Sequence, residues 1–335
     1  MKKIIVSAPG KLMLLGEHAV VYNKPCLVTA VDQRLRLTIE VLNIQEFQLD
    51  APDVDTVNYK KQIVGIGKGN IPKGAKFVEF AIKNFLDRTP LTPFIKGGVR
   101  RTGDLRGIKI TTKSEFSSRF GFGSSSASVV CVIKAMSELF NLNLSPKEIF
   151  DLSYKTVLDV QGAGSGFDVA AAVYGGTVYF IKGGITIEQL NISNLPLIIG
   201  YSGIKTDTVT LINQVKEKAE KYPKIIEGIY SSIEELVELA KVKLLANDLR
   251  SFGELMNINQ GYLDALGVSI NKLADMIYAS RIAGAYGAKL SGAGGGDCII
   301  AIAPEEKRIS VEKAIQQAGG EVIKVKTNAK GVKVE

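Results

Sequence analysis

The chain has 335 residues, of which 46% are hydrophobic and 23% charged, and this composition excludes a disordered or fibrous protein. Its 42 Lys and Arg residues outnumber its 34 Asp and Glu residues and leave a net charge of +8. That excess suits an acidic small molecule, an anionic membrane surface or a nucleic acid without choosing among them. The single histidine, His18, excludes a metal site built from several histidines.

The first half of the chain alternates short apolar runs with helical patterns. The runs predict strands over residues 3–6, 11–15, 26–31, 35–41 and 107–112. Pro9 and Gly10 are expected to separate the first two of these strands. Apolar residues at helical spacing predict helices over residues 76–86 and 125–140. Ser145 before Pro146 predicts the start of another helix, and the apolar residues 169–181 end in a strand-like TVYFI.

The composition loosens near residues 185–196, where we expect the boundary between two domains, residues 1–190 and 191–335. Beyond it, helices are expected over residues 208–221, 225–246, 250–266, 270–284 and 305–317, and strands over residues 298–303 and 321–326. Strands and helices alternate without regular βαβ units. An α+β protein of two domains is therefore favoured over a doubly wound sheet.

The cysteines and the N-terminus bear on the cellular compartment. Cys26, Cys131 and Cys298 lie far apart in apolar runs without C-x-x-C spacing. This predicts buried thiols in a reducing compartment, with neither a disulfide framework nor a zinc site. The apolar run before Ser7 is too short for a signal peptide, and no run of about 18 apolar residues follows, so we expect a cytoplasmic protein.

The segment RFGFGSSSAS (residues 119–128) is the first candidate site. Glycines let the backbone approach a ligand, and a hydroxyl-rich helix start offers free N–H groups, so the segment suits an anion such as phosphate. It is not the G-x-x-x-x-G-K-[ST] pattern, and Ser126 replaces the third glycine of G-x-G-x-x-G. For the segment alone, a Gly-Ser turn that only caps a helix is the simpler interpretation.

A second glycine-rich segment, KLSGAGGGD (residues 289–297), lies between an expected helix and an expected strand. A run of Gly and Ala is costly to order, so a loop folded around a ligand is favoured over a bare linker.

Two charged residues lie in apolar surroundings. Asp168 follows QGAGSGF and, taken alone, is most simply an N-cap. Lys11 in APGK needs an anionic partner, for which an aspartate is suitable. Together, two anion-binding loops, a lysine and an aspartate are the parts needed for phosphoryl transfer without a Walker loop. Backbone amides hold the phosphates of ATP, Mg²⁺ neutralises them, and the lysine and aspartate act at the acceptor hydroxyl.

The chain is identified as a member of the GHMP kinase superfamily on three motifs in order, APGKLMLLGEHAVVY, GFGSSSAS and KLSGAGGGDC, together with the Asp168 segment. The resemblance spans nearly the whole length. It implies a ribosomal-protein-S5-like N-terminal domain and a ferredoxin-like C-terminal domain, with ATP between them.

The resemblance also implies roles for individual residues. Asp168 would abstract or orient the proton of the acceptor hydroxyl, and Lys11 would keep Asp168 ionised. Ser125 would reach Mg²⁺. Glu17 and His18 fall where mevalonate kinases contact their substrate, beside Lys11 and Asp168. The residues expected around ATP are Arg119, Gly121, Gly123, Ser124, Ser125, Ser126, Gly292, Gly294 and Gly295.

Within the superfamily the resemblance points to two groups. GEHAVVYNKP and residues 253–269 resemble mevalonate kinases, which phosphorylate the 5-hydroxyl of mevalonate in isoprenoid biosynthesis. GSGFDVAAAVYGG and Asp297 resemble phosphomevalonate kinases, which form 5-diphosphomevalonate. The first group is the favoured expectation and the second is the alternative. Many mevalonate kinases hold Mg²⁺ with a glutamate about eleven residues before the catalytic aspartate. Here that position is Val157, and Asp159 is the nearby candidate for the second protein ligand.

A non-catalytic relative that binds nucleic acid is the alternative of a different class. No aromatic-basic platform of the RNA-binding kind is present, and the lysines of residues 216–224 are interleaved with Glu217 and Glu220. We therefore expect small-molecule partners, ATP and mevalonate or 5-phosphomevalonate, and neither nucleic acid nor a membrane. Whether the chain forms a homodimer is left open.

Overall fold

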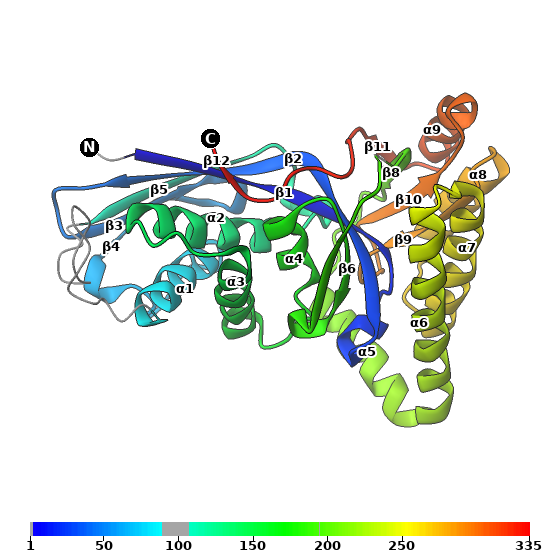
Figure 1. Ribbon diagram of the computed structural model, residues 1–335, viewed down its shortest axis with the longest axis horizontal. Helices are drawn as coiled ribbons and strands as arrows, with labels where there is room; N and C mark the ends of the chain where they lie inside the picture. Colours follow the sequence, from blue (N-terminus) through cyan, green and yellow to red (C-terminus); the bar gives the residue numbers. More distant parts are fainter. Residues whose placement is uncertain (1–2, 89–106, 194) are drawn as a thin grey trace.

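The computed structural model describes residues 3–88, 107–193 and 195–335, and its strands form two sheets (Figure 1). The first sheet contains β1 (Lys3–Leu15), β2 (Pro25–Val41), β3 (Glu46–Ala51), β4 (Thr56–Gln62), β5 (Ile108–Ser114), β6 (Thr177–Ile181), β7 (Thr186–Leu190) and β12 (Lys333–Val334). Its order is β12-β1-β2-β5-β3-β4, with β6 paired to β2 and β7 to β6. The described pairs are antiparallel except β3 with β5.

Strand β1 is continuous, so the expectation that Pro9 and Gly10 separate two strands is wrong. The pairing with β2 shifts register between these two residues, and this bulge absorbs the irregularity without ending the strand. Gly10 suits this close packing, because an added Cβ would lie 3.1 Å from Val31 and 3.2 Å from Phe122 and would push these neighbours slightly apart.

Strand β2 is also continuous, where two strands over residues 26–31 and 35–41 were expected. The polar residues in the middle of β2 stay in the sheet because Arg34 is buried and its guanidinium nitrogens all donate hydrogen bonds. Arg34 Nε donates to Ser7 Oγ at 2.7 Å, and its two terminal nitrogens donate to Lys330 O at 2.7 Å and Gly331 O at 2.8 Å. The residues after β11 thus return to the first sheet, where Ser7 Oγ donates to Glu335 Oε1 at 2.6 Å.

Four helices cover one face of the first sheet (Figure 1). They are α1 (Lys73–Arg88), α2 (Ser124–Leu139), α3 (Pro146–Gln161) and α4 (Phe167–Tyr174). The expected helices over residues 76–86 and 125–140 are confirmed within a few residues at their ends. The start of α3 is also confirmed, because Ser145 and Glu148 form a reciprocal capping box there.

The second sheet has the antiparallel order β11 (Glu321–Ile323), β8 (Leu197–Tyr201), β10 (Cys298–Ile302) and β9 (Gly287–Ser291). It is accompanied by α5 (Thr208–Lys221), α6 (Pro223–Leu245), α7 (Leu249–Leu266), α8 (Asn271–Ile282) and α9 (Arg308–Gln317). The helices match the sequence predictions, while β8 and β9 were not predicted.

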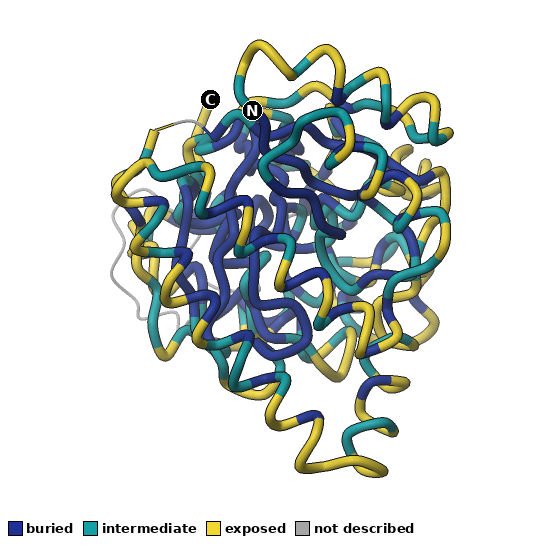
Figure 2. The backbone as a smooth tube through the Cα atoms, turned by 90° about the vertical axis from the view of Figure 1, so that its right-hand side faces the viewer, coloured by how far each residue is buried: buried dark blue, intermediate teal, exposed yellow. Residues whose placement is uncertain are grey.

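Strand β9 is an edge strand, and α7 covers its free edge with side-chain amides. Ala288 N donates to Asn257 Oδ1 at 3.0 Å, and Leu290 N donates to Gln260 Oε1 at 2.9 Å. The buried backbone lies at the centre of the molecule (Figure 2), and the α+β class is confirmed. Because β9 continues into the second glycine-rich segment, α7 fixes the base of that loop.

Candidate active site

The segment expected to bind phosphate forms a turn that leads directly into α2. Gly121 and Gly123 have φ of 72° and 78°, in the left-handed region that favours glycine, and Gly123 is the N-cap of α2. Ser124 and Ser125 are half-buried in the first turn of the helix, and Arg119 is exposed just before it. Since the first amide groups of a helix lack partners within it, this turn offers N–H groups from which an anion could accept hydrogen bonds.

Lys11 and Asp168 meet at this turn. An added Cβ on Gly123 would lie 3.3 Å from Lys11 Cε and 3.6 Å from Asp168 Cβ, so both side chains flank the same glycine. Lys11 Nζ donates to Gly121 O at 2.8 Å. Burial lowers the pKa of Lys11, and the negative charges of Asp168 and Asp297 oppose that shift. The expectation that an aspartate accompanies the embedded lysine is therefore confirmed.

Asp168 lies in the first turn of α4 and is held by two donors. Ser126 Oγ donates to Asp168 Oδ2 at 2.5 Å, and Val169 N donates to Oδ1 at 3.0 Å. The interpretation of Asp168 as an N-cap is wrong, because Gly166 occupies that position with φ of 95°. The carboxylate is instead linked to the first turn of α2.

The second glycine-rich segment is the loop between β9 and β10. Its φ values are positive at Gly292 (99°), Gly294 (87°) and Gly295 (66°). The next carboxylate, Asp297, lies 3.3 Å from Lys205 Nζ. An added Cβ on Gly121 would lie 2.5 Å from Asp297 Oδ2, so this loop touches the turn of Gly121 and Gly123. The two candidate loops, far apart in sequence, therefore form one site.

Glu17 and His18 lie in the turn after β1, and both contact the second domain. Glu17 Oε1 forms an ion pair with Lys289 Nζ, and Asn259 Nδ2 donates to Glu17 Oε2 at 3.1 Å. His18 has φ of 60°, and its Nε2 lies 2.9 Å from Ala293 O. Burial lowers the pKa of His18. The turn is thus joined to the glycine-rich loop itself.

Sequence reasoning missed three residues that complete this arrangement, Lys205, Asn259 and Lys289. Lys289 opens the KLSGAGGGDC motif, and that position was the only signal for it. Asn259 lies in a helix whose apolar periodicity gives no sign of a polar role, and Lys205 lies in a loop without a motif.

The comparisons with known proteins agree with this geometry. The family models for the N-terminal and C-terminal domains of GHMP kinases match residues 79–176 and 230–321. The mevalonate kinase of Thermococcus sibiricus is 37% identical over 99% of this chain and 98% of its own length. The chain belongs to the GHMP kinase family.

Solved structures of GHMP kinases share the fold. The mevalonate kinase of Methanococcus jannaschii has a TM-score of 0.80 and 27% identity, covering 98% of this chain and 99% of that one. A phosphomevalonate kinase of Streptococcus pneumoniae has a TM-score of 0.80 with 18% identity, covering 98% and 100%, and therefore shares the fold alone. As a GHMP kinase, the chain uses ATP as its phosphate donor.

The structure places Asp159 away from the other site residues of this GHMP kinase. Its carboxylate accepts from Asn84 Nδ2 at 2.8 Å and from Lys155 Nζ at 2.6 Å, between α1 and α3. Val157 is buried. Within residues 3–88, 107–193 and 195–335, no group of three or more His, Cys, Asp or Glu side chains could hold a metal ion.

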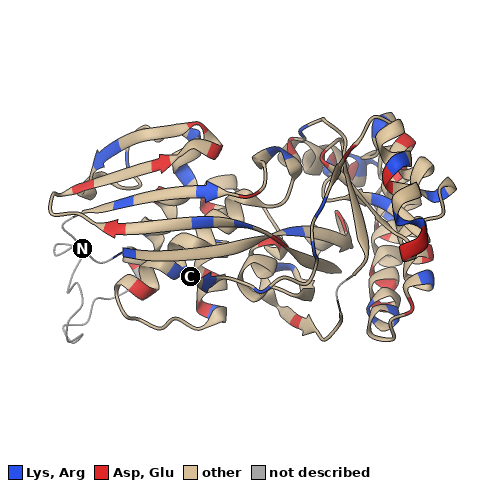
Figure 3. Cartoon of the chain, turned by 90° about the horizontal axis from the view of Figure 1, so that it is seen from above, with Lys and Arg blue, Asp and Glu red and all other residues tan. Residues whose placement is uncertain are grey.

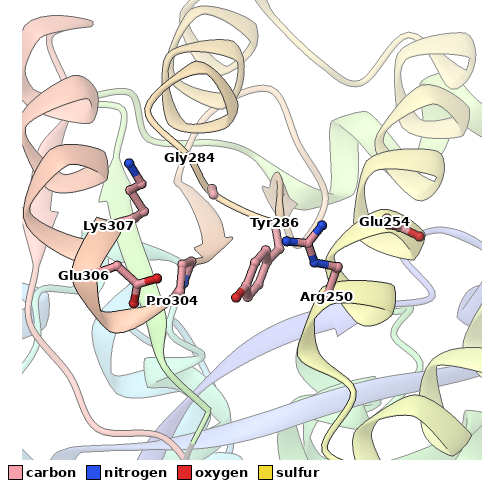
Figure 4. A pocket seen from close by; sticks show the side chains of 8 residues that line it. Arg250, Glu254, Gly284, Tyr286, Pro304, Glu306 and Lys307 are labelled. Carbon is pink, nitrogen blue, oxygen red and sulfur yellow. The ribbon is translucent and has the colours of Figure 1, made fainter.

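Other surfaces of the kinase are separate from this site. A cavity of about 410 Å³ lies in the second domain, lined by Arg250, Glu254, Gly284, Ala285, Tyr286, Pro304, Glu306 and Lys307 (Figure 4). It contains none of the residues expected at the active site. Basic and acidic residues are interleaved along the strands and helices (Figure 3), and the described helices include none long and apolar enough to span a membrane.

Proposed function

We propose that this GHMP kinase transfers the γ-phosphoryl group of ATP to the 5-hydroxyl of mevalonate. One observation carries the proposal: Lys11 and Asp168 flank the same glycine at the N-terminus of α2. A phosphate bound at that helix end lies within reach of a carboxylate that can take the hydroxyl proton. The names of the curated relatives support mevalonate as the acceptor.

Each part of the site has a separate role in phosphoryl transfer. The amide groups of Gly123, Ser124 and Ser125 bind the phosphates, and the loop of Gly292, Gly294 and Gly295 closes over them. Asp168, held by Ser126, orients the acceptor hydroxyl and accepts its proton during transfer. The positive charge of Lys11 lies beside Asp168 and stabilises negative charge on the transferring group. Arg119, exposed beside the turn, is placed for the outer phosphates or the ribose.

Mg²⁺ fits this donor set. Magnesium prefers oxygen ligands and commonly uses one or two protein groups together with substrate phosphates and water. Ser125 supplies a hydroxyl at the start of α2, and the carboxylates nearest the phosphate-binding turn are Asp168 and Asp297. Asp159 already binds Lys155 and Asn84, so we propose Ser125 as the protein ligand and not Asp159. The ion would neutralise the phosphate charge.

We also propose that the boundary near residue 190 separates two domains that enclose ATP and the acceptor. The change from the first sheet to the second between β7 and β8 supports this boundary. The expected second domain, residues 191–335, is too long at its C-terminal end, because the segment after β11 pairs with the first sheet. The buried thiols of Cys26, Cys131 and Cys298 suit a reducing cytoplasm.

A coupled assay of ADP release tests the acceptor. Purified enzyme is mixed with ATP, Mg²⁺ and, separately, mevalonate, 5-phosphomevalonate, galactose or homoserine. We expect turnover with mevalonate at least 100-fold above the other three in kcat/KM. Turnover only with 5-phosphomevalonate would replace the proposal with the alternative that Asp297 and GSGFDVAAAVYGG suggested, and no turnover with any of the four would refute both.

A further inference from the structure

The ion pair between Glu17 and Lys289 is the most deeply buried pair of opposite charges among the described residues. Both side chains have a relative exposure of 0%. Lys289 Nζ also donates to Leu290 O, and Asn259, likewise fully buried, donates to the second Glu17 oxygen. Removing two charges from water is costly, and a pair of apolar residues in the same space is often as stable. The pair therefore calls for a reason other than stability.

Its position supplies that reason. Glu17 belongs to the turn after β1, whereas Lys289 lies on β9 and Asn259 on α7. The pair thus joins the first sheet to the second. Two parallel links lie beside it. Ser291 Oγ accepts from Met13 N at 3.0 Å and donates to Met13 O at 2.9 Å.

The second link involves a strained histidine. His18, next to Glu17, has φ of 60°, a conformation that is unfavourable for a residue other than glycine and persists only where its surroundings impose it. Its Nε2 lies 2.9 Å from Ala293 O, inside the glycine-rich loop. Glu17, the residue before His18 in the same turn, is also held by residues of the second domain.

We propose that Lys289 and Asn259 are positioning residues that act through Glu17. They fix the turn of Glu17 and His18 against the glycine-rich loop. The acceptor site and the loop that covers the phosphates are thereby held in a fixed position relative to each other. This inference rests on the proposed function only for the identity of the acceptor. Both Glu17 carboxylate oxygens are engaged within the protein, so Glu17 acts on the acceptor through the shape of the turn. His18 is then the residue of this turn that we expect to contact the acceptor.

The variants Lys289→Met and Glu17→Gln each remove one charge, and the double variant Glu17→Gln/Lys289→Met removes both. The double variant leaves no unpaired charge in the interior and is therefore expected to fold even if a single variant does not. We expect its KM for the acceptor to rise at least tenfold, with KM for ATP within threefold of the wild type. An acceptor KM in the double variant equal to that of the wild type would overturn the proposal, because the ion pair would then have no effect on acceptor binding.

The matched control is a lysine that pairs with a buried carboxylate far from the site. Lys61 Nζ lies 3.1 Å from Glu79 Oε2, and the Glu79 side chain has an exposure of 0%, but this pair lies between β4 and α1, away from the site. Lys61→Met is expected to lower the melting temperature as Lys289→Met does while leaving the acceptor KM within twofold of the wild type. A tenfold rise in acceptor KM in Lys61→Met would mean that general destabilisation produces the effect.

A second readout does not depend on turnover. Hydrogen–deuterium exchange of the free protein is expected to accelerate at least tenfold in both residues 16–22 and residues 292–297 of Lys289→Met, and in neither segment of Lys61→Met. Acceleration confined to β9, or absent, would refute the coupling. If wild-type enzyme fails to phosphorylate mevalonate but the exchange result holds, the acceptor assignment fails and the positioning role stands.

Discussion

Replacing Asp168 with asparagine separates the charge of this side chain from its shape. Asp168 accepts hydrogen bonds from Ser126 Oγ at 2.5 Å and Val169 N at 3.0 Å. An asparagine retains both contacts, because its oxygen can accept from Val169 N while the serine hydroxyl reverses and accepts from the new amide. Asp168→Asn therefore leaves the local geometry in place and removes the proton acceptor and the negative charge beside Lys11.

The size of the effect follows from these two losses. A positioned general base contributes about 10²- to 10⁴-fold to the rate. The lost charge adds to this, since Lys11 is buried and Asp168 is the first of the groups that oppose the lowering of its pKa. We expect kcat to fall at least ~10³-fold, which corresponds to about 4 kcal/mol of barrier at about 1.4 kcal/mol per factor of ten.

The assay combines single-turnover ADP release with calorimetric binding of ATP, whose affinity should stay within threefold because the amides of α2 are unchanged. Ser126→Ala is the matched control: it removes one hydrogen bond to Asp168 but keeps the base, so its loss in kcat should be at least tenfold smaller. If Asp168→Asn retained kcat within tenfold of the wild type, the assignment of Asp168 as proton acceptor would be refuted.

Three further measurements test other parts of the structure. Gly294→Ala should lower both kcat and the melting temperature, because φ of Gly294 is 87° and an added Cβ would lie 2.3 Å from Val268 O. Gly228 lies in a helix, and an added Cβ there would meet no neighbouring atom within 4 Å. Gly228→Ala should therefore stabilise the fold by about 0.5–1 kcal/mol in urea denaturation. Asp248, the N-cap of α7, has its pKa lowered to about 2 by Ser251 and Lys243, so it stabilises the fold above its unfolded pKa of about 4 and loses that effect as the pH falls toward 2. Asp248→Ala should therefore lower the urea midpoint at pH 7, and the deficit should shrink by pH 2.5; an equal deficit at both pH values would contradict this. Chelation of divalent ions with EDTA should abolish turnover and added Mg²⁺ should restore it, whereas full activity in EDTA would exclude the metal role.

Local signals in the sequence predicted much of the candidate site. Glycines at Gly121 and Gly123 before a hydroxyl-rich helix start indicated an anion site because the backbone chemistry of that turn is contained in a few neighbouring residues. The same holds for the Ser145 and Glu148 capping box. The association of Lys11 with Asp168 was predicted from a general requirement, that a lysine in apolar surroundings needs an anion, rather than from any local pattern.

Features that depend on distant parts of the chain were not predicted. Whether β1 ends at Pro9 depends on the pairing offered by β2, which accommodates a bulge there. Asn259 in α7 has the sequence surroundings of an ordinary amphipathic helix, and its role becomes visible only when Glu17 from the other end of the chain lies against it. The sequence favours an N-cap at Asp168 because aspartate is common both at the N-cap and in the first turn of a helix. Only the observation that Gly166 is the N-cap places Asp168 in the first turn.

The return of the C-terminal segment to the first sheet has a consequence for the order of events during synthesis. Ser7 and Arg34 are synthesised long before their partners Lys330, Gly331 and Glu335, which follow them by 296 to 328 residues. The guanidinium of Arg34 can bond to Ser7 early, but its hydrogen bonds to Lys330 and Gly331 cannot form until the whole second sheet has been synthesised. Pairings of such long sequence separation are slow to close. We expect nascent chains halted before residue 326 to keep the first sheet sensitive to protease, and chains extended through residue 335 to become resistant; early resistance would show that the sheet closes without its last strand.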